Sequence, residues 1–378
     1  MTSVPATQHL EQALALAKQS LNITSPNPRV GCVITSSAGQ VLGQGHTQRA
    51  GGPHAEIMAL QDAQAQGHSV QGATAYVTLE PCAHHGRTGP CCDALIAAGI
   101  RKVIATHTDP NPLVAGQGFA RLCAAGVEVT VLPPDDPLAI QSRALNIGFF
   151  SRMIRKTPWV RMKLAASLDG QTALQNGVSQ WITSPQARAD GHAWRARSCA
   201  VLTGIGTVLA DNPRLDVRLV DTPRQPTLVV VDSRLETPLD AALFIAGRPC
   251  LIYAAVQNDA KKIALEARGA TVVYLPGIAP GTQSKVDLQA MLIDLAQREV
   301  NELHVEAGHK LNGSFIRAGL VDEFLVYLAP KLLGQGQGMT NLGPFVALNE
   351  AVDLAFESVE RVGPDLRILA QPPGRDAF

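Results

Sequence analysis

The chain has 378 residues, and its 32 Lys and Arg balance 32 Asp and Glu, so the formal net charge is zero. This length exceeds what one hydrophobic core usually supports, so two domains are expected. The neutral balance argues against a nucleic-acid partner, and the lack of any stretch approaching the roughly 20 apolar residues that span a bilayer argues against a membrane.

Strand-like and helix-like segments alternate along the first half of the chain, which is typical of an α/β domain. Around 133–158, prolines flank a probable helix, after which the alternation restarts. We therefore expect one domain over residues 1–148 and a second over 149–378. The segments that carry the pattern in the first half are 30–35, 54–66, 73–79, 92–99 and 102–107.

The second half predicts another α/β domain. It opens with an apolar strand at 159–168, and a helix at 183–198 follows, with Ser184 as its N-cap and Pro185 as its first residue. Further strand-like segments, among them "TLVVVDS", "CLIYAA" and "ELHVEAG", come later with helices between several of them.

Three of the seven cysteines fall within the stretch "LEPCAHHGRTGPCC" at 79–92. An odd number of cysteines does not suggest a disulfide framework, and the N-terminal segment lacks a signal-peptide pattern, so we expect a reducing, cytoplasmic location. Clustered cysteines in such a location more often bind metal or catalyse. The other four, which we expect to be small buried core residues in apolar segments, are Cys32, Cys123, Cys199 and Cys250.

A zinc-deaminase pattern includes this cluster. His54 and Glu56 stand two residues apart at the expected first turn of a helix, so their side chains point in different directions. An H-x-E pair followed by Pro81-Cys82 and a later cysteine is the signature of zinc deaminases. Cys91 supplies that later thiolate at the expected N-terminus of a helix, where the pKa of a thiol is lowered.

One imidazole and two thiolates leave the fourth tetrahedral position of zinc open for water, as in catalytic sites. Zinc lowers the pKa of such a water toward ~7, and Glu56 is expected to carry the proton to departing ammonia. The alternative is a closed structural site with Cys92, His84 or His85 as fourth ligand, which leaves Glu56 without a role. The same ligands also fit iron or cobalt.

Motifs in both halves closely resemble the bifunctional deaminase/reductase family of riboflavin biosynthesis. The first half carries "SPNPRVGCVI", "AGGPHAEIMAL", "YVTLEPCAHHGRTGPCCDALI" and "DPNP", and the second carries "KLAASLDG", "SQWITSP", "VLADNPRL", "VEAG" and "VYLAPKLLG". The resemblance implies a cytidine-deaminase-like three-layer α/β/α domain followed by a dihydrofolate-reductase-like α/β domain. One departure is Gly89, where the family usually has proline.

The resemblance also implies an activity. The first domain would use Zn²⁺ to remove the 2-amino group of 2,5-diamino-6-(5-phosphoribosylamino)pyrimidin-4(3H)-one. The second would then use NADPH to reduce the ribosyl group to ribityl. A homo-oligomer, with a dimer formed through the reductase domain, is implied as well.

Residue by residue, the resemblance gives the same zinc ligands and the same proton carrier as the pattern above. It adds substrate contacts in the first domain at Asn27, His46 and Arg87. The Asn27 amide could read a pyrimidine edge. Arg87 could bind a phosphate through two hydrogen bonds, or it could be a solvated loop charge.

The residues of the second half carry a weaker signal on their own. The stretch "TGIGTVLADNP" at 203–213 lacks the third glycine of a Rossmann fingerprint, so it is either a tight turn or an approach to a phosphate. Lys163, in an apolar strand, is either a substrate contact or an ion-paired structural residue. Asp211, Lys163 and water are the candidate proton donors of the reduction. By resemblance, NADPH contacts fall on Ala165, Trp181, Thr207, Asp211, Ser233 and Gly308, and substrate contacts on Ser179, Arg195, Leu215, Arg218 and Glu306.

Other classes of function share the zinc pattern. A deaminase acting on a base in RNA would want a basic surface and would leave the second half unexplained. A zinc-stabilised binding module would need a metal coordinated fully by protein. A chain with a working deaminase and an altered reductase is a further alternative. The bifunctional enzyme accounts for both halves.

Overall fold

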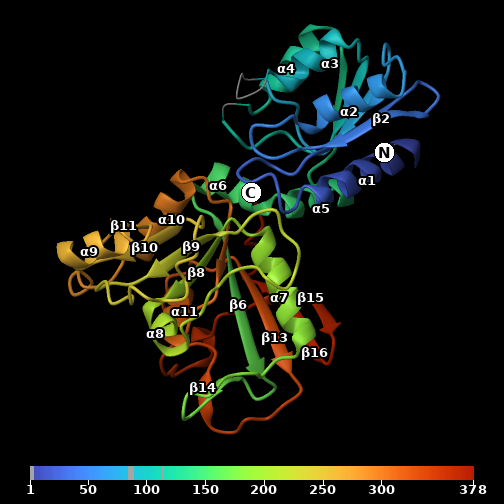
Figure 1. Ribbon diagram of the computed structural model, residues 1–378. Coiled ribbons are helices and arrows are strands. Elements are labelled where there is room, and N and C mark those ends of the chain that lie inside the picture. Colours follow the sequence, from blue (N-terminus) through green and yellow to red (C-terminus); the bar gives the residue numbers. More distant parts are fainter. Residues whose placement is uncertain (1–3, 84–88, 113) are drawn as a thin grey trace. The chain divides into compact units, whose positions relative to one another are not determined.

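A computed structural model describes residues 4–83, 89–112 and 114–378. The chain divides into two compact units, residues 1–156 and 157–378 (Figure 1). The expected boundary between 148 and 149 falls inside helix α6 (Ile147–Arg155), which the structure keeps whole within the first unit. None of the helices in the described ranges is long and apolar enough to cross a membrane.

The first unit is built on a five-stranded sheet with the order β2-β1-β3-β4-β5. Strand β1 runs antiparallel to β2 and β3, whereas β3, β4 and β5 are parallel. The carboxyl ends of β2 and β3 therefore lie at the same edge of the sheet. The strands are β1 (Gly31–Thr35), β2 (Val41–His46), β3 (Thr74–Val77), β4 (Lys102–Ala105) and β5 (Glu128–Val131).

Alternation along the strands of this sheet supplies two apolar faces. In β1, Cys32 and Ile34 pack with α2 (Ala55–Ala65), α3 (Cys91–Ala97) and α4 (Gln117–Ala124), while Val33 packs with α1 (Val4–Gln19) and α5 (Pro137–Leu145). Helix α1 lies so close to β1 that a Cβ atom on Gly31 would sit 1.9 Å from the carbonyl oxygen of Ala13. The expected three-layer α/β/α fold is confirmed.

The second unit contains a nine-stranded sheet with the order β11-β10-β9-β8-β12-β6-β13-β16-β15. Its first seven strands in this order are parallel, and β16 and β15 extend one edge antiparallel. They are β6 (Trp159–Ser167), β8 (Ala200–Gly204), β9 (Thr227–Val231), β10 (Cys250–Ala254), β11 (Ala270–Tyr274), β12 (Glu302–Val305), β13 (Glu323–Ala329), β15 (Ala355–Val362) and β16 (Asp365–Gln371). Strands β7 (Gln171–Leu174) and β14 (Gly336–Gly338) form a separate pair.

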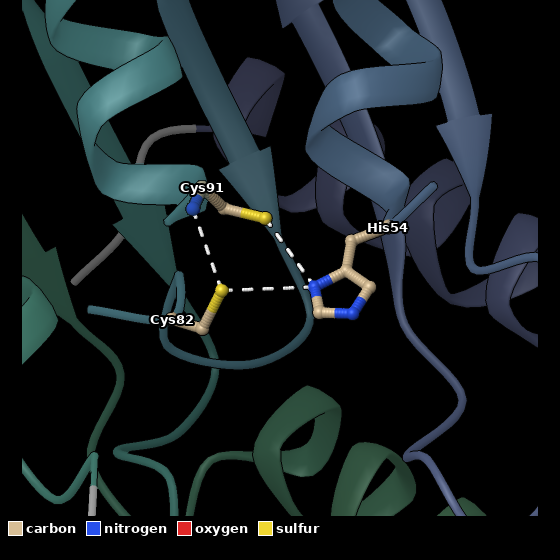
Figure 2. Close-up of side chains that lie close together, drawn as sticks. All are labelled: His54, Cys82 and Cys91. Carbon is tan, nitrogen blue, oxygen red and sulfur yellow. Dashed lines mark hydrogen bonds between the residues drawn. The ribbon is translucent and has the colours of Figure 1, made fainter. Parts of the chain in front are cut away.

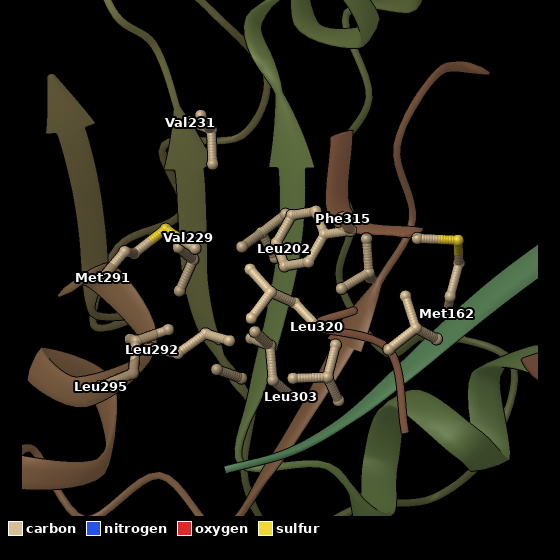
Figure 3. Packing of buried hydrophobic residues seen from close by; sticks show 14 of the residues in the cluster. Met162, Leu202, Val229, Val231, Met291, Leu292, Leu295, Leu303, Phe315 and Leu320 are labelled. Carbon is tan, nitrogen blue, oxygen red and sulfur yellow. The ribbon is translucent and has the colours of Figure 1, made fainter. Parts of the chain in front are cut away.

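Helices cover both faces of this larger sheet. Buried Met162, Leu202 and Leu303 pack against α10 (Leu288–Gln297) and α11 (His309–Arg317) on one face (Figure 3). The other face carries α7 (Pro185–Arg197), α8 (Ile205–Asp211) and α9 (Asp259–Glu266). Ser184 caps α7 by accepting a hydrogen bond from the Ala187 N–H at 3.2 Å, as the sequence predicts. The expected α/β reductase-type domain is confirmed.

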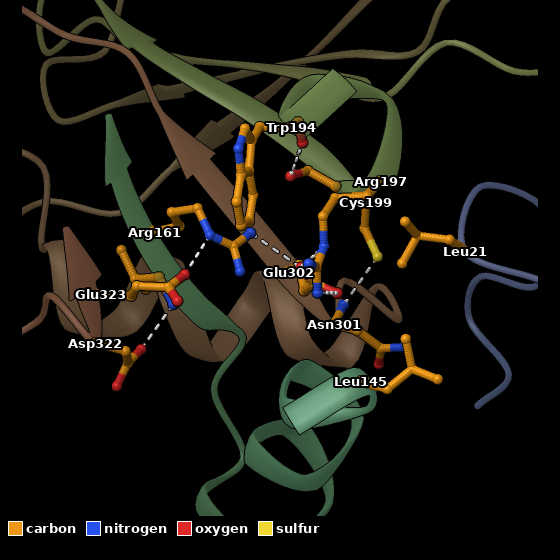
Figure 4. A network of polar contacts seen from close by, with 12 residues as sticks. Leu21, Leu145, Arg161, Trp194, Arg197, Cys199, Asn301, Glu302, Asp322 and Glu323 are labelled. Carbon is orange, nitrogen blue, oxygen red and sulfur yellow. Dashed lines mark hydrogen bonds and ion pairs between the residues drawn. The ribbon is translucent and has the colours of Figure 1, made fainter. Parts of the chain in front are cut away.

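A charged stripe lies between α7 and the sheet, on the residues of β6 and β12 that alternate with the apolar ones. Buried Arg161 forms ion pairs with Glu302, at 3.0 Å, and with Glu323 (Figure 4). Its guanidinium carbon also lies 4.4 Å from the ring centroid of Trp194. Arg197 of α7 also pairs with Glu302, at 3.0 Å, so a buried carboxylate of the sheet joins α7 to the stripe. Removing one partner of such a buried pair costs far more than losing a surface pair.

Candidate active sites

Three ligand side chains converge in the first unit (Figure 2). His54 is the N-cap of α2, Cys91 is the first residue of α3, and Cys82 lies in the loop between β3 and α3. His54 Nδ1 lies 3.4 Å from Cys91 Sγ and 3.7 Å from Cys82 Sγ, and the three ligand atoms lie within 4.8 Å of one another. One imidazole and two sulfurs at these separations suit a single zinc ion.

Hydrogen bonds link the two thiols and the imidazole, so each group affects the pKa of the others. Hydrogen bonding from Cys91 lowers the pKa of Cys82 to about 4, and the same pairing raises the pKa of Cys91. Hydrogen bonding to Cys82 raises the pKa of His54. The Cys91 backbone N–H also donates to Cys82 Sγ at 3.4 Å. The site therefore stabilises the Cys82 thiolate, whereas the lowered pKa expected for Cys91 at a helix N-terminus is not found, because its pairing with Cys82 and its burial act in the opposite direction.

Glu56 stands in the first turn of α2 and is 3% exposed. Burial, followed by the nearby Cys82 charge, raises the pKa of its carboxyl to about 7. A carboxyl with a pKa near neutrality can both accept and return a proton, as a general acid and base must.

Of the three candidate fourth ligands, Cys92 lies within the described residues. Cys92 is fully buried, its thiol donates to Asp93 Oδ1 at 3.7 Å, and burial raises its pKa to about 11, so it packs as a core residue and does not join the cluster. His84 and His85 lie outside the described residues.

Three of the four remaining cysteines, Cys32, Cys199 and Cys250, are buried as expected. The expectation for Cys123 is wrong, because this residue is exposed. Leu122 faces the core of the unit from α4, and the next residue along the helix turns away from that side.

The expected substrate contacts of the first unit lie near β1 and β2. His46 ends β2 opposite Gly31, and its Nδ1 lies 3.1 Å from Ser20 Oγ. Asn27 closes a turn before β1, where its N–H donates to the Thr24 carbonyl at 2.8 Å. Arg87 lies outside the described residues.

A cavity of about 1410 Å³ lies in the second unit. Every residue of this unit that the family resemblance assigned to substrate or cofactor lines it, as does Lys163. These residues are Lys163, Ala165, Ser179, Trp181, Arg195, Thr207, Asp211, Leu215, Arg218, Ser233, Glu306 and Gly308. The segment 277–288 also lines the cavity, and its sequence carries no motif that could have identified it.

Glu306, directly after β12, is the electrostatic centre of this cavity. Arg195 pairs with its carboxylate through two hydrogen bonds, one of them at 2.9 Å, and Lys163 Nζ lies 3.8 Å away. Burial opposes the charged form, but Arg195 and Lys163 hold the pKa of Glu306 well below its usual range. Burial lowers the pKa of Lys163, with Glu306 acting in the opposite direction. Lys163 is thus both ion-paired and exposed to the cavity.

Side chains hold the backbone of segment 214–218 along the cavity wall. Arg248 donates to the carbonyls of Arg214 and Leu215 at 2.8 and 2.7 Å, and Arg195 donates to that of Asp216 at 2.9 Å. The Arg218 N–H donates to His192 Nδ1 at 3.1 Å. His192 and Arg248 carry no sequence signal for this role, because it depends on contacts across the fold.

Comparisons with known proteins match both units. Residues 4–107 match the cytidine and deoxycytidylate deaminase zinc-binding region, and residues 158–368 match the RibD C-terminal domain. Riboflavin biosynthesis protein RibD of Escherichia coli is 42% identical over 363 residues, which cover 95% of this chain and 97% of that protein. The corresponding protein of Aquifex aeolicus is 38% identical over 360 residues, covering 95% and 96%.

Solved structures match over nearly the whole chain. Acinetobacter baumannii RibD has a TM-score of 0.86 and 38% identity, and the match covers 97% of this chain and 99% of that one. A diaminohydroxyphosphoribosylaminopyrimidine deaminase/5-amino-6-(5-phosphoribosylamino)uracil reductase from Thermotoga maritima has a TM-score of 0.83 and 29% identity with the same coverage.

The fold and the two sites define a two-unit protein in which a zinc-deaminase domain precedes a reductase-type α/β domain. Relatives more than 30% identical match this arrangement along almost their entire length. The chain belongs to the RibD family of riboflavin biosynthesis proteins.

We expect His192 to make the stability of the second unit depend on pH. Burial, followed by the charges of Arg195 and Arg218, lowers the pKa of His192 to about 4. An unfolded histidine titrates near ~6.5. The stabilising contribution of neutral His192 is therefore fully present above the unfolded pKa and is lost as the pH falls through the folded one.

His192→Asn keeps an acceptor for the Arg218 N–H but cannot titrate in this range. From pH 7 to pH 4, we expect wild type to lose up to about 3 kcal/mol more unfolding free energy than the variant. Urea denaturation followed by tryptophan fluorescence measures this, because all three tryptophans lie in the second unit. Equal losses in the two proteins would contradict the assignment of a neutral His192.

Proposed function

We propose that the chain catalyses two consecutive steps of riboflavin biosynthesis. The first unit deaminates 2,5-diamino-6-(5-phosphoribosylamino)pyrimidin-4(3H)-one hydrolytically to 5-amino-6-(5-phosphoribosylamino)uracil. The second reduces the ribosyl group of that product, with NADPH, to give 5-amino-6-(5-phosphoribitylamino)uracil. The observation that carries the proposal is the pairing, within one chain of the RibD family, of the His54, Cys82 and Cys91 cluster with a cavity lined by all the expected reductase residues.

In the deaminase unit, His54, Cys82 and Cys91 would hold zinc, whose chemistry when bound is to activate water as a Lewis acid. Glu56 Oε accepts a proton as water attacks the ring carbon that bears the amino group. The same carboxyl then donates this proton to the leaving nitrogen, so that ammonia departs. A pKa raised to about 7 suits both transfers, because neither direction is strongly uphill at neutral pH.

In the reductase unit, the cavity of about 1410 Å³ exceeds the ~300–1,000 Å³ of a typical small-molecule pocket and leaves room for cofactor and substrate together. Gly206 has open space where a Cβ would stand, and Gly308 is the N-cap of α11, so backbone can approach the phosphates of a dinucleotide there. NADPH supplies hydride chemistry when bound. We assign cofactor contacts to Ala165, Trp181, Thr207, Asp211, Ser233 and Gly308.

Charge distribution in the cavity favours different roles for Arg195 and Arg218, two of the four arginines that line it. Arg195 is engaged by Glu306 and by the Asp216 carbonyl, so it orients Glu306 toward the ribityl hydroxyls. The side chain of Arg218 is 47% exposed, pairs with Asp216 at 2.5 Å, and is the better candidate for the substrate phosphate. Lys163, with its lowered pKa and its place beside Glu306, is our candidate for the proton donor. Ser179 and Leu215 complete the proposed substrate contacts.

The test is a coupled assay that follows ammonia release and NADPH oxidation in parallel. Glu56→Gln should lower ammonia release from the diaminopyrimidine about 10²- to 10⁴-fold, the usual contribution of a general acid and base. NADPH oxidation with the already deaminated substrate should stay at the wild-type rate. Glu11→Gln, which changes an exposed carboxylate on α1, is the matched control.

Two outcomes would contradict the proposal. Wild type that releases ammonia but never oxidises NADPH, even with deaminated substrate, would remove the reductase assignment. Glu56→Gln that deaminates at the wild-type rate would remove Glu56 as the proton carrier.

We propose further that the protein is a cytoplasmic homodimer assembled through the reductase unit. Strand β15 is the edge of the nine-stranded sheet and exposes Phe356 and Val359 at 71% and 54%. Nearby in sequence, Val346 and Leu348 are more than 90% exposed. An edge strand that exposes large apolar side chains can pair with a second copy of the same strand.

The double variant Phe356→Asp/Val359→Asp places charges on this edge and should convert the dimer into a monomer of 40.0 kDa in analytical ultracentrifugation. Ile263→Asp changes an isolated residue of α9, which is 68% exposed, and should leave the dimer intact. A wild-type monomer, or a double variant that still dimerises, would contradict the proposed interface.

A further inference from the structure

Glu80 is a buried carboxylate that the mechanism above does not use. It lies between β3 and Cys82 and is 3% exposed. Within the described residues, no cation pairs with it, and four backbone N–H groups surround it. Oε1 accepts from Gly118 at 2.8 Å and Phe119 at 3.2 Å, and Oε2 accepts from Asp109 at 3.0 Å and Gly116 at 2.9 Å.

These four donors belong to one segment, residues 109–119, which follows β4 and leads into α4. Gly116 is the N-cap of α4, and Gly118 and Phe119 lie in its first turn, so Glu80 caps this helix from a distant part of the chain. The fit is tight, since a Cβ atom on Gly118 would sit 2.0 Å from the Pro81 carbonyl oxygen. Helix α4 therefore begins directly against the backbone that carries Cys82.

Cys82 is held from the other side as well. Its carbonyl accepts from the Cys92 N–H at 3.2 Å, and its Sγ accepts from the Cys91 N–H at 3.4 Å. Only Pro81, with its fixed φ, separates Cys82 from Glu80. Cys82 is thus held on both sides, by the start of α3 after it in the sequence and by the Glu80 carboxylate before it.

We propose that Glu80 is a positioning residue that holds Cys82 in the geometry required for metal binding. Its carboxylate joins the loop of this ligand to the 109–119 segment and so limits how far the sulfur can move when metal is absent. It is not a second proton carrier, because each oxygen already accepts two hydrogen bonds. The inference rests on the proposed function only in so far as the His54, Cys82 and Cys91 site binds zinc.

The test uses Glu80→Gln in the full chain. The amide keeps one acceptor oxygen but turns an NH₂ group toward two backbone donors, so half of the arrangement is lost. We expect zinc affinity, measured by competition with a chromophoric chelator, to fall about 10- to 100-fold, as is usual when a residue that supports a metal ligand is changed. The thiolate-to-cobalt absorption of the Co²⁺-loaded protein should change in the same variant.

Hydrogen exchange distinguishes positioning from folding. In Glu80→Gln, amides of 109–119 should exchange faster while β1 stays protected and NADPH oxidation with deaminated substrate is unchanged. Glu128→Gln removes an exposed carboxylate of the same unit, which pairs with Lys102, and should match wild type in every measurement.

Two results would overturn the inference. Zinc affinity and a cobalt spectrum equal to wild type would mean that Glu80 does not place Cys82. Loss of protection throughout the first unit would make it a folding determinant instead. Both differ from failure of the proposed function, in which wild type itself binds no zinc and releases no ammonia.

Discussion

The convergence of one imidazole and two thiols on a single point is the constraint that organises the first unit. His54 follows β2 and Cys82 follows β3, and the carboxyl ends of these two strands share one edge of the sheet. Ligands in open α/β sheets gather at that edge. Cys91 completes the set because α3 begins there. The order of the strands and the starts of two helices bring these ligand atoms together around one metal position. The buried Glu80 supports the loop that carries Cys82.

Much of this site could be predicted from local sequence. The H-x-E pair, the Pro-Cys pair and a later cysteine are recognisable in the sequence as a zinc-deaminase pattern. The structure brings all three ligands together. The anchoring role of Glu80 could not be predicted, because its four partners lie about 30 to 40 residues away and are backbone groups with no sequence signature. The exposure of Cys123 was missed for a related reason, since its helix buries only a narrow apolar stripe.

In the second unit the strands were predictable and the site was predictable only by resemblance. Alternation on β6 and β12 sends apolar residues to the core and sends Arg161, Lys163, Glu302 and Glu306 to the other face. Read from the sequence, these charges look like interruptions of buried strands. In the structure they form a stripe between α7 and the sheet. Glu302, at one end of the stripe, is engaged in ion pairs, and Glu306, at the other end, lines the cavity. His192 and Arg248 then fix the cavity wall from outside that stripe.

The central claim is that the zinc site keeps an open position. X-ray absorption at the zinc edge of the purified full chain tests it most directly, because sulfur and nitrogen ligands differ in number and distance. The account predicts one zinc per chain with two sulfurs near ~2.3 Å and the remaining light-atom ligands near ~2.0–2.1 Å. Three or four sulfurs, a second imidazole in the zinc shell, or retention of the same shell when His54 is replaced would show a closed or different site and contradict the account.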